Sequence, residues 1–203
     1  MKLKLIKVLR TLLENNKYNI AKIENRIMIY WEDNSSYPED YIEISQNNNS
    51  LYNVLEVHRN DKKNIVENVD EKVAISIAVI ICNRLFQPTS NDISITRKLR
   101  QLVESGDIVL ADNLLKQHLE DSVYLLELED INRVSLIVNK DKADVKFHGR
   151  TIVKNAKLSR GYVVLYNYAK HLMEFNSIYV QIKKVVGYTA KKVYMENIYL
   201  FGE

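Results

Sequence analysis

The chain has few of the residues that make turns, crosslinks and thiolate metal sites. It contains 203 residues but only one cysteine, five glycines and two prolines. A single cysteine, Cys82, excludes an intrachain disulfide and a zinc site built from cysteines, and it fits a reducing compartment. The scarcity of glycine and proline predicts long regular elements with simple connections. We therefore expect a folded cytoplasmic protein.

Long hydrophobic runs are also missing. The longest, Val73 to Phe86, is shorter than the roughly 20 residues that cross a bilayer, so we expect a buried helix and no membrane association. The first residues, MKLKLIKVLRTLLENN, place leucines at helical spacing and lack a small-residue cleavage site. They predict an amphipathic helix rather than a signal peptide.

Several common catalytic signatures do not occur. The four histidines are never paired at zinc-ligand spacing, and no glycine-rich phosphate loop or nucleophile elbow is found. Charge is more informative, because its sign changes along the chain. Residues 1–88 are neutral, residues 89–144 carry 7 basic and 11 acidic side chains, and residues 145–203 carry 10 basic and 3 acidic ones. An acidic band before a basic band suits a polyanion-binding protein with a metal-binding edge, and equally a self-neutralising surface.

The first half predicts an α+β unit over residues 1–88. A helix over about 2–15 precedes two hairpin patterns, which form a four-stranded meander. Asp70 is placed to cap the helix that follows, and the segment QPTSND (87–92) predicts a boundary.

The second half, residues 93–203, predicts an α-β-β-β-α-β order. Two helical pieces break near Gly106, three strand patterns end at ADVKF (143–147), and a long helix covers about 151–175. The last segments, SIYVQIKKVV and KKVYMENIYLF, alternate like a C-terminal hairpin. The fold class is therefore α+β or α/β, with two units that pack separately or as one globular body.

An acid-x-lysine triplet, Asp144-Val145-Lys146, lies on the third strand pattern, with Asp130 fourteen residues earlier. In the helix GYVVLYNYAKHL, the first, fifth and eighth positions are Gly161, Leu165 and Tyr168. Together with the element order, these residues resemble the PD-(D/E)XK (restriction-endonuclease-like) nuclease superfamily over about 93–186. Val164 stands where many members have glutamine, and the strand before Asp144 is polar.

The resemblance implies a metal-dependent nuclease or a nuclease-fold nucleic-acid-binding protein. Asp130 and Asp144 would hold Mg²⁺ or Mn²⁺, with Glu120 or Glu104 as a further ligand, and Lys146 would act on the attacking water or the phosphate. In the alternative interpretation, Asp144 and Lys146 lie on a solvated strand face and Asp130 lies in a turn. Whether such a site cleaves or only binds is left open.

Basic residues follow the triplet. Arg150, Lys154 and Lys157 would share one face at the start of the predicted long helix, where the helix dipole disfavours cations. With Arg160 they predict a phosphate-binding surface for nucleic acid, or else a solvated basic face.

A different class of function rests on the segment YWEDNSSYPEDY (30–41). Aromatic residues with acidic neighbours are typical of protein-binding patches. The first half also faintly resembles cytoplasmic immunity proteins of bacterial toxin systems. The alternative function is therefore a non-enzymatic, immunity- or antitoxin-like binding factor.

Overall fold

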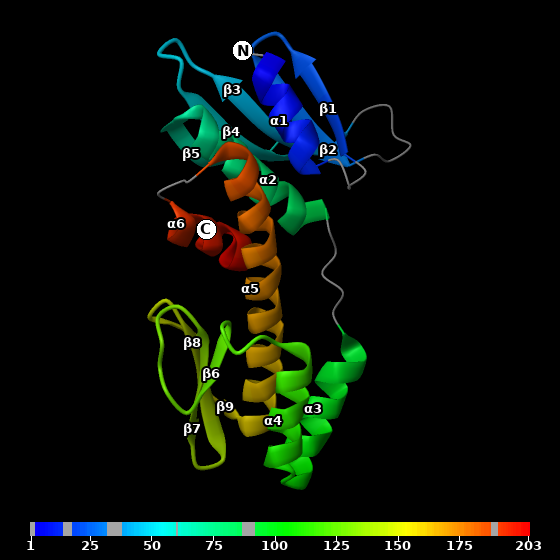
Figure 1. The fold of residues 1–203 in the computed structure, drawn as a ribbon, viewed down its shortest axis with the longest axis vertical. Helices are drawn as coiled ribbons and strands as arrows, with labels where there is room; N and C mark the ends of the chain where they lie inside the picture. The colour runs from blue at the N-terminus through cyan, green and yellow to red at the C-terminus, as the bar shows by residue number, and fades with distance from the viewer. Residues whose placement is uncertain (1–2, 14–17, 32–37, 60, 87–91, 188–190) are drawn as a thin grey trace. The chain divides into compact units, whose positions relative to one another are not determined.

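The computed structural model describes residues 3–13, 18–31, 38–59, 61–86, 92–187 and 191–203. In this part of the chain it has six helices and two sheets (Figure 1), which confirms the α+β class. Two compact units are present: residues 1–88 with 177–203, and residues 89–176. No helix among the described residues is long and apolar enough to cross a membrane.

The first unit contains an antiparallel sheet in the order β1-β2-β3-β4-β5. Its strands are β1 (Tyr18–Ile23), β2 (Arg26–Trp31), β3 (Asp40–Gln46), β4 (Tyr52–His58) and β5 (Asp61–Val69), and its helices are α1 (Leu3–Leu13), α2 (Glu71–Phe86) and α6 (Lys192–Phe201).

Helix α2 forms the centre of this unit and packs against β3, β4, α1 and α6. Its residues from Val73 to Asn83 are buried, as the apolar run predicts. Asp70 accepts a hydrogen bond from the backbone N–H of Val73 at 2.9 Å, so the predicted cap is confirmed. Helix α1 buries Leu5, Leu9 and Leu13, the leucine stripe expected from helical spacing.

The predicted four-stranded meander is wrong by one strand. β5, with the sequence DKKNIVENV, pairs with β4 at the edge of the sheet and is mostly exposed. Its charged residues mask the alternation that identifies half-buried strands, and charge is common on edge strands because it discourages pairing with other chains.

The second unit places a mixed sheet beside three helices. Its helices are α3 (Ile93–Ser105), α4 (Ile108–His118) and the first part of α5 (Leu158–Val186), and its strands are β6 (Tyr124–Leu126), β7 (Val134–Asn139), β8 (Lys142–Phe147) and β9 (Arg150–Lys157). The strand order is β6-β7-β8-β9, with a parallel β6–β7 pair. Gly106 adopts positive φ between α3 and α4, which confirms the predicted break.

Helix α5 lies between this sheet and helices α3 and α4 (Figure 1). Its residues Tyr162, Leu165, Ala169 and Leu172 are buried and form an apolar stripe at helical spacing. Gly161 lies so close to the sheet that a Cβ atom there would be 2.8 Å from the Cβ of Ala143.

The predicted start of the long helix is wrong, because residues 150–157 form strand β9. The two residues before it, His148 and Gly149, both have positive φ, as a tight type I′ hairpin turn requires. They pair Phe147 with Arg150. The β-branched residues Thr151, Ile152 and Val153 then favour a strand over a helix.

The predicted C-terminal hairpin is also wrong, because α5 continues to Val186 and α6 follows. Phe175, Tyr179 and Ile182 are buried at helical spacing, so the apolar stripe of α5 overrides the local alternation. No strand follows α5 among the described residues. Residues 177–203 group with the first unit. The sequence predicted instead that they belong to a unit over 93–203.

Candidate functional site

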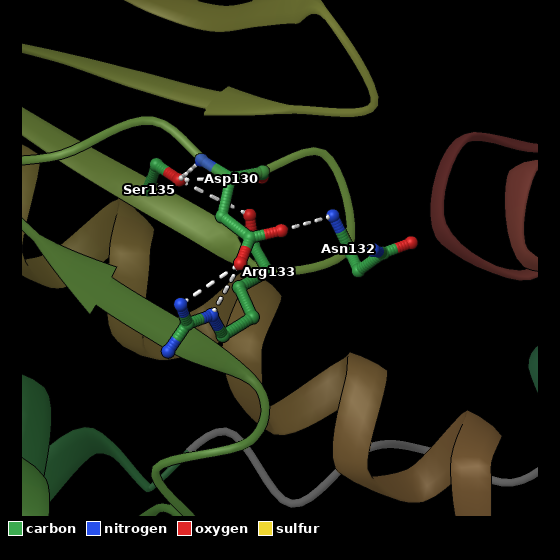
Figure 2. Close-up of polar contacts among 4 residues, drawn as sticks. All are labelled: Asp130, Asn132, Arg133 and Ser135. Atoms are coloured by element: carbon green, nitrogen blue, oxygen red, sulfur yellow. Dashed lines mark hydrogen bonds and ion pairs between the residues drawn. The ribbon is translucent and has the colours of Figure 1, made fainter.

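Asp130 lies in the loop between β6 and β7, where it organises a turn (Figure 2). Its carboxylate accepts hydrogen bonds from the backbone N–H of Asn132 at 2.8 Å and from the Arg133 side chain at 2.8 Å. Its own backbone N–H donates to the hydroxyl of Ser135 at 3.0 Å. The hydrogen bond from Asn132, followed by that from Arg133, lowers the pKa of the Asp130 carboxyl below its usual value.

Asp144 stabilises an irregularity in the β8–β9 pair. The pairing slips between Ala143 and Val145, and Asn155 on β9 has a φ of 51°. The Asp144 carboxylate accepts the backbone N–H of Asn155 at 2.6 Å. It therefore provides the acceptor that the β-bulge removes from the ladder.

Lys146 lies on the same sheet face as Asp144, since both alternate with the buried Ala143, Val145 and Phe147. Its ammonium group forms an ion pair with Glu129 at 2.7 Å. The acid-x-lysine triplet thus occupies one strand face as expected, but each of its two charged groups has a protein partner.

The two candidate helix acids lie in different places. Glu120 follows α4 and accepts a hydrogen bond from Ser122 at 3.2 Å, whereas Glu104 on α3 accepts one from Ser159 on α5 at 3.1 Å. Among the described residues, no three His, Cys, Asp or Glu side chains come together in a group that could hold a metal ion. The structure therefore does not assemble Asp130, Asp144 and Glu120 into such a group.

The basic residues lie at different positions from those predicted. Arg150, Lys154 and Lys157 are on strand β9 and do not share a helix face, while Arg160 is in the first turn of α5. Of these four, Lys157 and Arg160 come together at a pocket in the second unit.

This pocket, which we call the β9–α5 pocket, has a volume of about 710 Å³. Its wall is formed by helix α3, strands β8 and β9 and the first turns of α5. The lining residues are Arg100, Glu104, Lys142, Asn155, Ala156, Lys157, Ser159, Arg160, Val163 and Val164.

The pocket carries more positive than negative side chains. Four cations line it, and none of them forms a side-chain hydrogen bond or an ion pair with a described residue. The single carboxylate is that of Glu104, which accepts the hydrogen bond from Ser159. Lys142 lies directly opposite Lys157 in the strand pair, an arrangement that costs stability because like charges repel.

The start of α5 adds to this positive potential. Arg160 lies in the first turn, where the positive end of the helix dipole disfavours a cation and favours an anion. Two further contacts hold this end of α5 in place: Ser159 donates to Glu104, and the hydroxyl of Tyr162 donates to Asp112 on α4 at 2.8 Å. Burial raises the pKa of Tyr162, so this hydroxyl stays a donor.

Sequence reasoning missed two of the four pocket cations, Arg100 and Lys142. The basic run in ITRKLR on α3 was a signal for Arg100. Lys142 had no local signal, because it reaches the pocket only through the register of β8 with β9.

The segment 30–41 was predicted to be an acidic and aromatic protein-binding loop. Its central part, residues 32–37, lies outside the described residues. Comparison of the chain with protein-family models, with curated proteins and with solved structures finds no match.

Proposed function

We propose that the second unit binds nucleic acid, with the cations of the β9–α5 pocket in contact with phosphate groups. The observation that carries the proposal is the convergence of four cations that have no ionic partner among the described residues. Bringing them together raises the free energy of the unliganded fold. An anion in the pocket would remove this repulsion, and phosphate oxygens match both arginine and lysine donors.

Neighbouring cations favour a polymer over a small isolated anion. Arg97 lies one helical turn before Arg100 on α3, and Lys154 lies beside Asn155 in the bulge of β9; both are exposed. These residues extend the positive charge beyond the pocket, so that successive phosphates of one strand would each meet a cation.

Metal-dependent hydrolysis at Asp130, Asp144 and Lys146 stays a prediction, and the proposal does not depend on it. The Asp130 carboxylate is bound by Arg133, the Asp144 carboxylate by the backbone of Asn155, and Lys146 by Glu129. Cleavage with Mg²⁺ or Mn²⁺ would require these partners to be exchanged for metal and substrate.

The proposal is tested by fluorescence anisotropy with labelled oligonucleotides at low salt. We expect the double variant Lys142→Gln, Lys157→Gln to bind at least about tenfold more weakly than the wild type, since each lost phosphate contact is worth on the order of 1 kcal/mol. Lys116→Gln, an exposed lysine on α4 that does not line the pocket, should bind like the wild type.

Parallel samples contain Mn²⁺ or EDTA, and their products are separated on a gel. Cutting that requires Mn²⁺ and is lost in Lys146→Ala would support the hydrolytic prediction. Binding that is equal in the double variant and the wild type would contradict the proposed function. Failure of the wild type to bind any nucleic acid would contradict it too, and would favour the protein-binding alternative.

A further inference from the structure

We infer that the β9–α5 pocket accepts an unpaired nucleotide, so that the second unit selects single-stranded over double-stranded nucleic acid. This inference rests on the proposed function and specifies its substrate. It follows from the concave shape of the site, from the apolar part of its wall and from the side-chain amide of Asn155, which has no hydrogen-bond partner among the described residues.

The site is concave. The four cations converge on a single hollow of about 710 Å³, which is within the usual size range of small-molecule pockets. A double helix presents its phosphates on a convex surface with the bases stacked inside, so it would touch only the rim. A flexible single strand can place one nucleotide inside the hollow while its neighbouring phosphates follow the rim.

Part of the pocket wall is apolar. Ala156 on β9 and Val163 and Val164 on α5 line the pocket, and a site for phosphate alone would have no use for them. Both valines are partly exposed, although the neighbouring residues Tyr162 and Leu165 are buried. An apolar surface in the wall of a basic pocket suits the faces of a base and a sugar.

Asn155 adds a polar group to the lining of the pocket. Its backbone N–H is held by Asp144 at 2.6 Å, and its positive φ of 51° marks the bulge. Its side-chain amide has no hydrogen-bond partner among the described residues, and Asn155 is one of the residues that line the pocket. An amide offers both a donor and an acceptor, which matches the edge of an unpaired base. On this view Asp144 is a positioning residue, since it orients the bulge that presents Asn155.

The charge of the pocket also predicts the salt dependence of binding. Four cations and one carboxylate leave an excess of three positive charges. If three phosphates of a single strand are neutralised, the logarithm of the binding constant should fall with the logarithm of salt concentration with a slope of about −2.

The test compares one labelled oligonucleotide with the same strand annealed to its complement, at several salt concentrations. We expect the single strand to bind at least about tenfold more tightly, because only it can bury a nucleotide against the valines. Val164→Phe should fill the hollow and remove most of this preference while weak binding to the duplex persists. Asn155→Gly keeps the positive φ accessible and removes the side chain that carries the amide, so it should weaken binding to the single strand with little effect on the duplex.

The outcomes separate the inference from the proposed function. Equal affinity for single strand and duplex, both lost in the Lys142→Gln, Lys157→Gln variant, would overturn the inference and leave the proposed function standing. If the preference for the single strand survives in both Val164→Phe and Asn155→Gly, the pocket is not the source of that preference and the inference is wrong. Thermal unfolding followed by circular dichroism checks that each variant is folded, and Asn155→Gly remains informative if Val164→Phe does not fold.

Discussion

Lys142 on β8 lies directly opposite Lys157 on β9, and both side chains line the same pocket. Strand pairing usually places opposite charges or apolar groups at such positions, because facing like charges are destabilising. The two lysines therefore repel each other in the β9–α5 pocket, next to the start of helix α5.

Reversal of one of these charges should stabilise the free protein and impair binding. Lys157→Glu would face Lys142 with an opposite charge and would lie just before the first turn of α5, so we expect the free energy of unfolding to rise by about 1 kcal/mol. Urea denaturation measures this change, and anisotropy should show weaker binding to a single strand. Lys154→Glu, on the same strand but outside the pocket, is the matched control for the stability measurement only. A Lys157→Glu protein that is no more stable than this control would show that repulsion between Lys142 and Lys157 does not destabilise the free protein.

Removal of the Asp144 carboxylate should destabilise the second unit without any metal present. Asp144→Ala leaves the backbone N–H of Asn155 without its acceptor, a loss of about 1 kcal/mol at this partly exposed site. Asp144→Asn keeps an oxygen acceptor and should lose less. Denaturation in EDTA checks both variants. If neither changes stability in EDTA, while divalent ions stabilise only the wild type, Asp144 is a metal ligand rather than a support for the bulge.

Gly161 is required by the close approach of α5 to the sheet. In Gly161→Ala the new Cβ would lie 2.8 Å from the Cβ of Ala143 and 3.0 Å from Cδ1 of Leu136. We expect overpacking of about 1–3 kcal/mol to exceed the gain of up to about 1 kcal/mol in helix propensity. Chemical denaturation measures the net loss. The double variant with Ala143→Gly should be less destabilised than the sum of the single variants, and strict additivity would show that the two positions are not in contact.

Asp130 should make stability depend on pH. Its pKa is lower in the folded protein than in the unfolded chain, so the folded state binds fewer protons over the intervening range. The resulting stabilisation is present above the unfolded pKa of about 3.9 and is lost as the pH falls through the folded value. The stability difference between wild type and Asp130→Asn should thus be largest near neutral pH and shrink in acid. Arg133→Gln should reduce it, and a difference that grows as the pH falls would refute this account.

Helices with a continuous apolar stripe were predictable from the sequence. Leu5 and Leu9 in α1, and Leu165 and Ala169 in α5, repeat at helical spacing, and their burial follows from that spacing. Short strands with regular alternation were equally clear, such as β8 with its buried Val145. Local signals failed where a segment carried two patterns. Residues 177–186 alternate like a strand, but they continue the buried stripe of α5.

The candidate site was less accessible to sequence reasoning. Lys157 and Arg160 were expected to act together within one helix, whereas a strand ends and a helix begins between them. Their meeting with Arg100 depends on the packing of α3 against the start of α5, seen in the hydrogen bond from Ser159 to Glu104. Contacts between residues so far apart in the chain leave no local pattern.

The sequence by itself determined a fold of mixed helices and strands, the buried helix α2, the break at Gly106 and the basic character of the chain after residue 145. These features arise from the periodicity of apolar side chains, from backbone preferences and from composition, all of which act over a few residues. Only the tertiary structure decided that Asp144 supports a bulge and that Lys142, facing Lys157, completes a positive pocket. Strand register and helix packing bring those groups together, and both depend on the free energy of the whole unit rather than on any short segment.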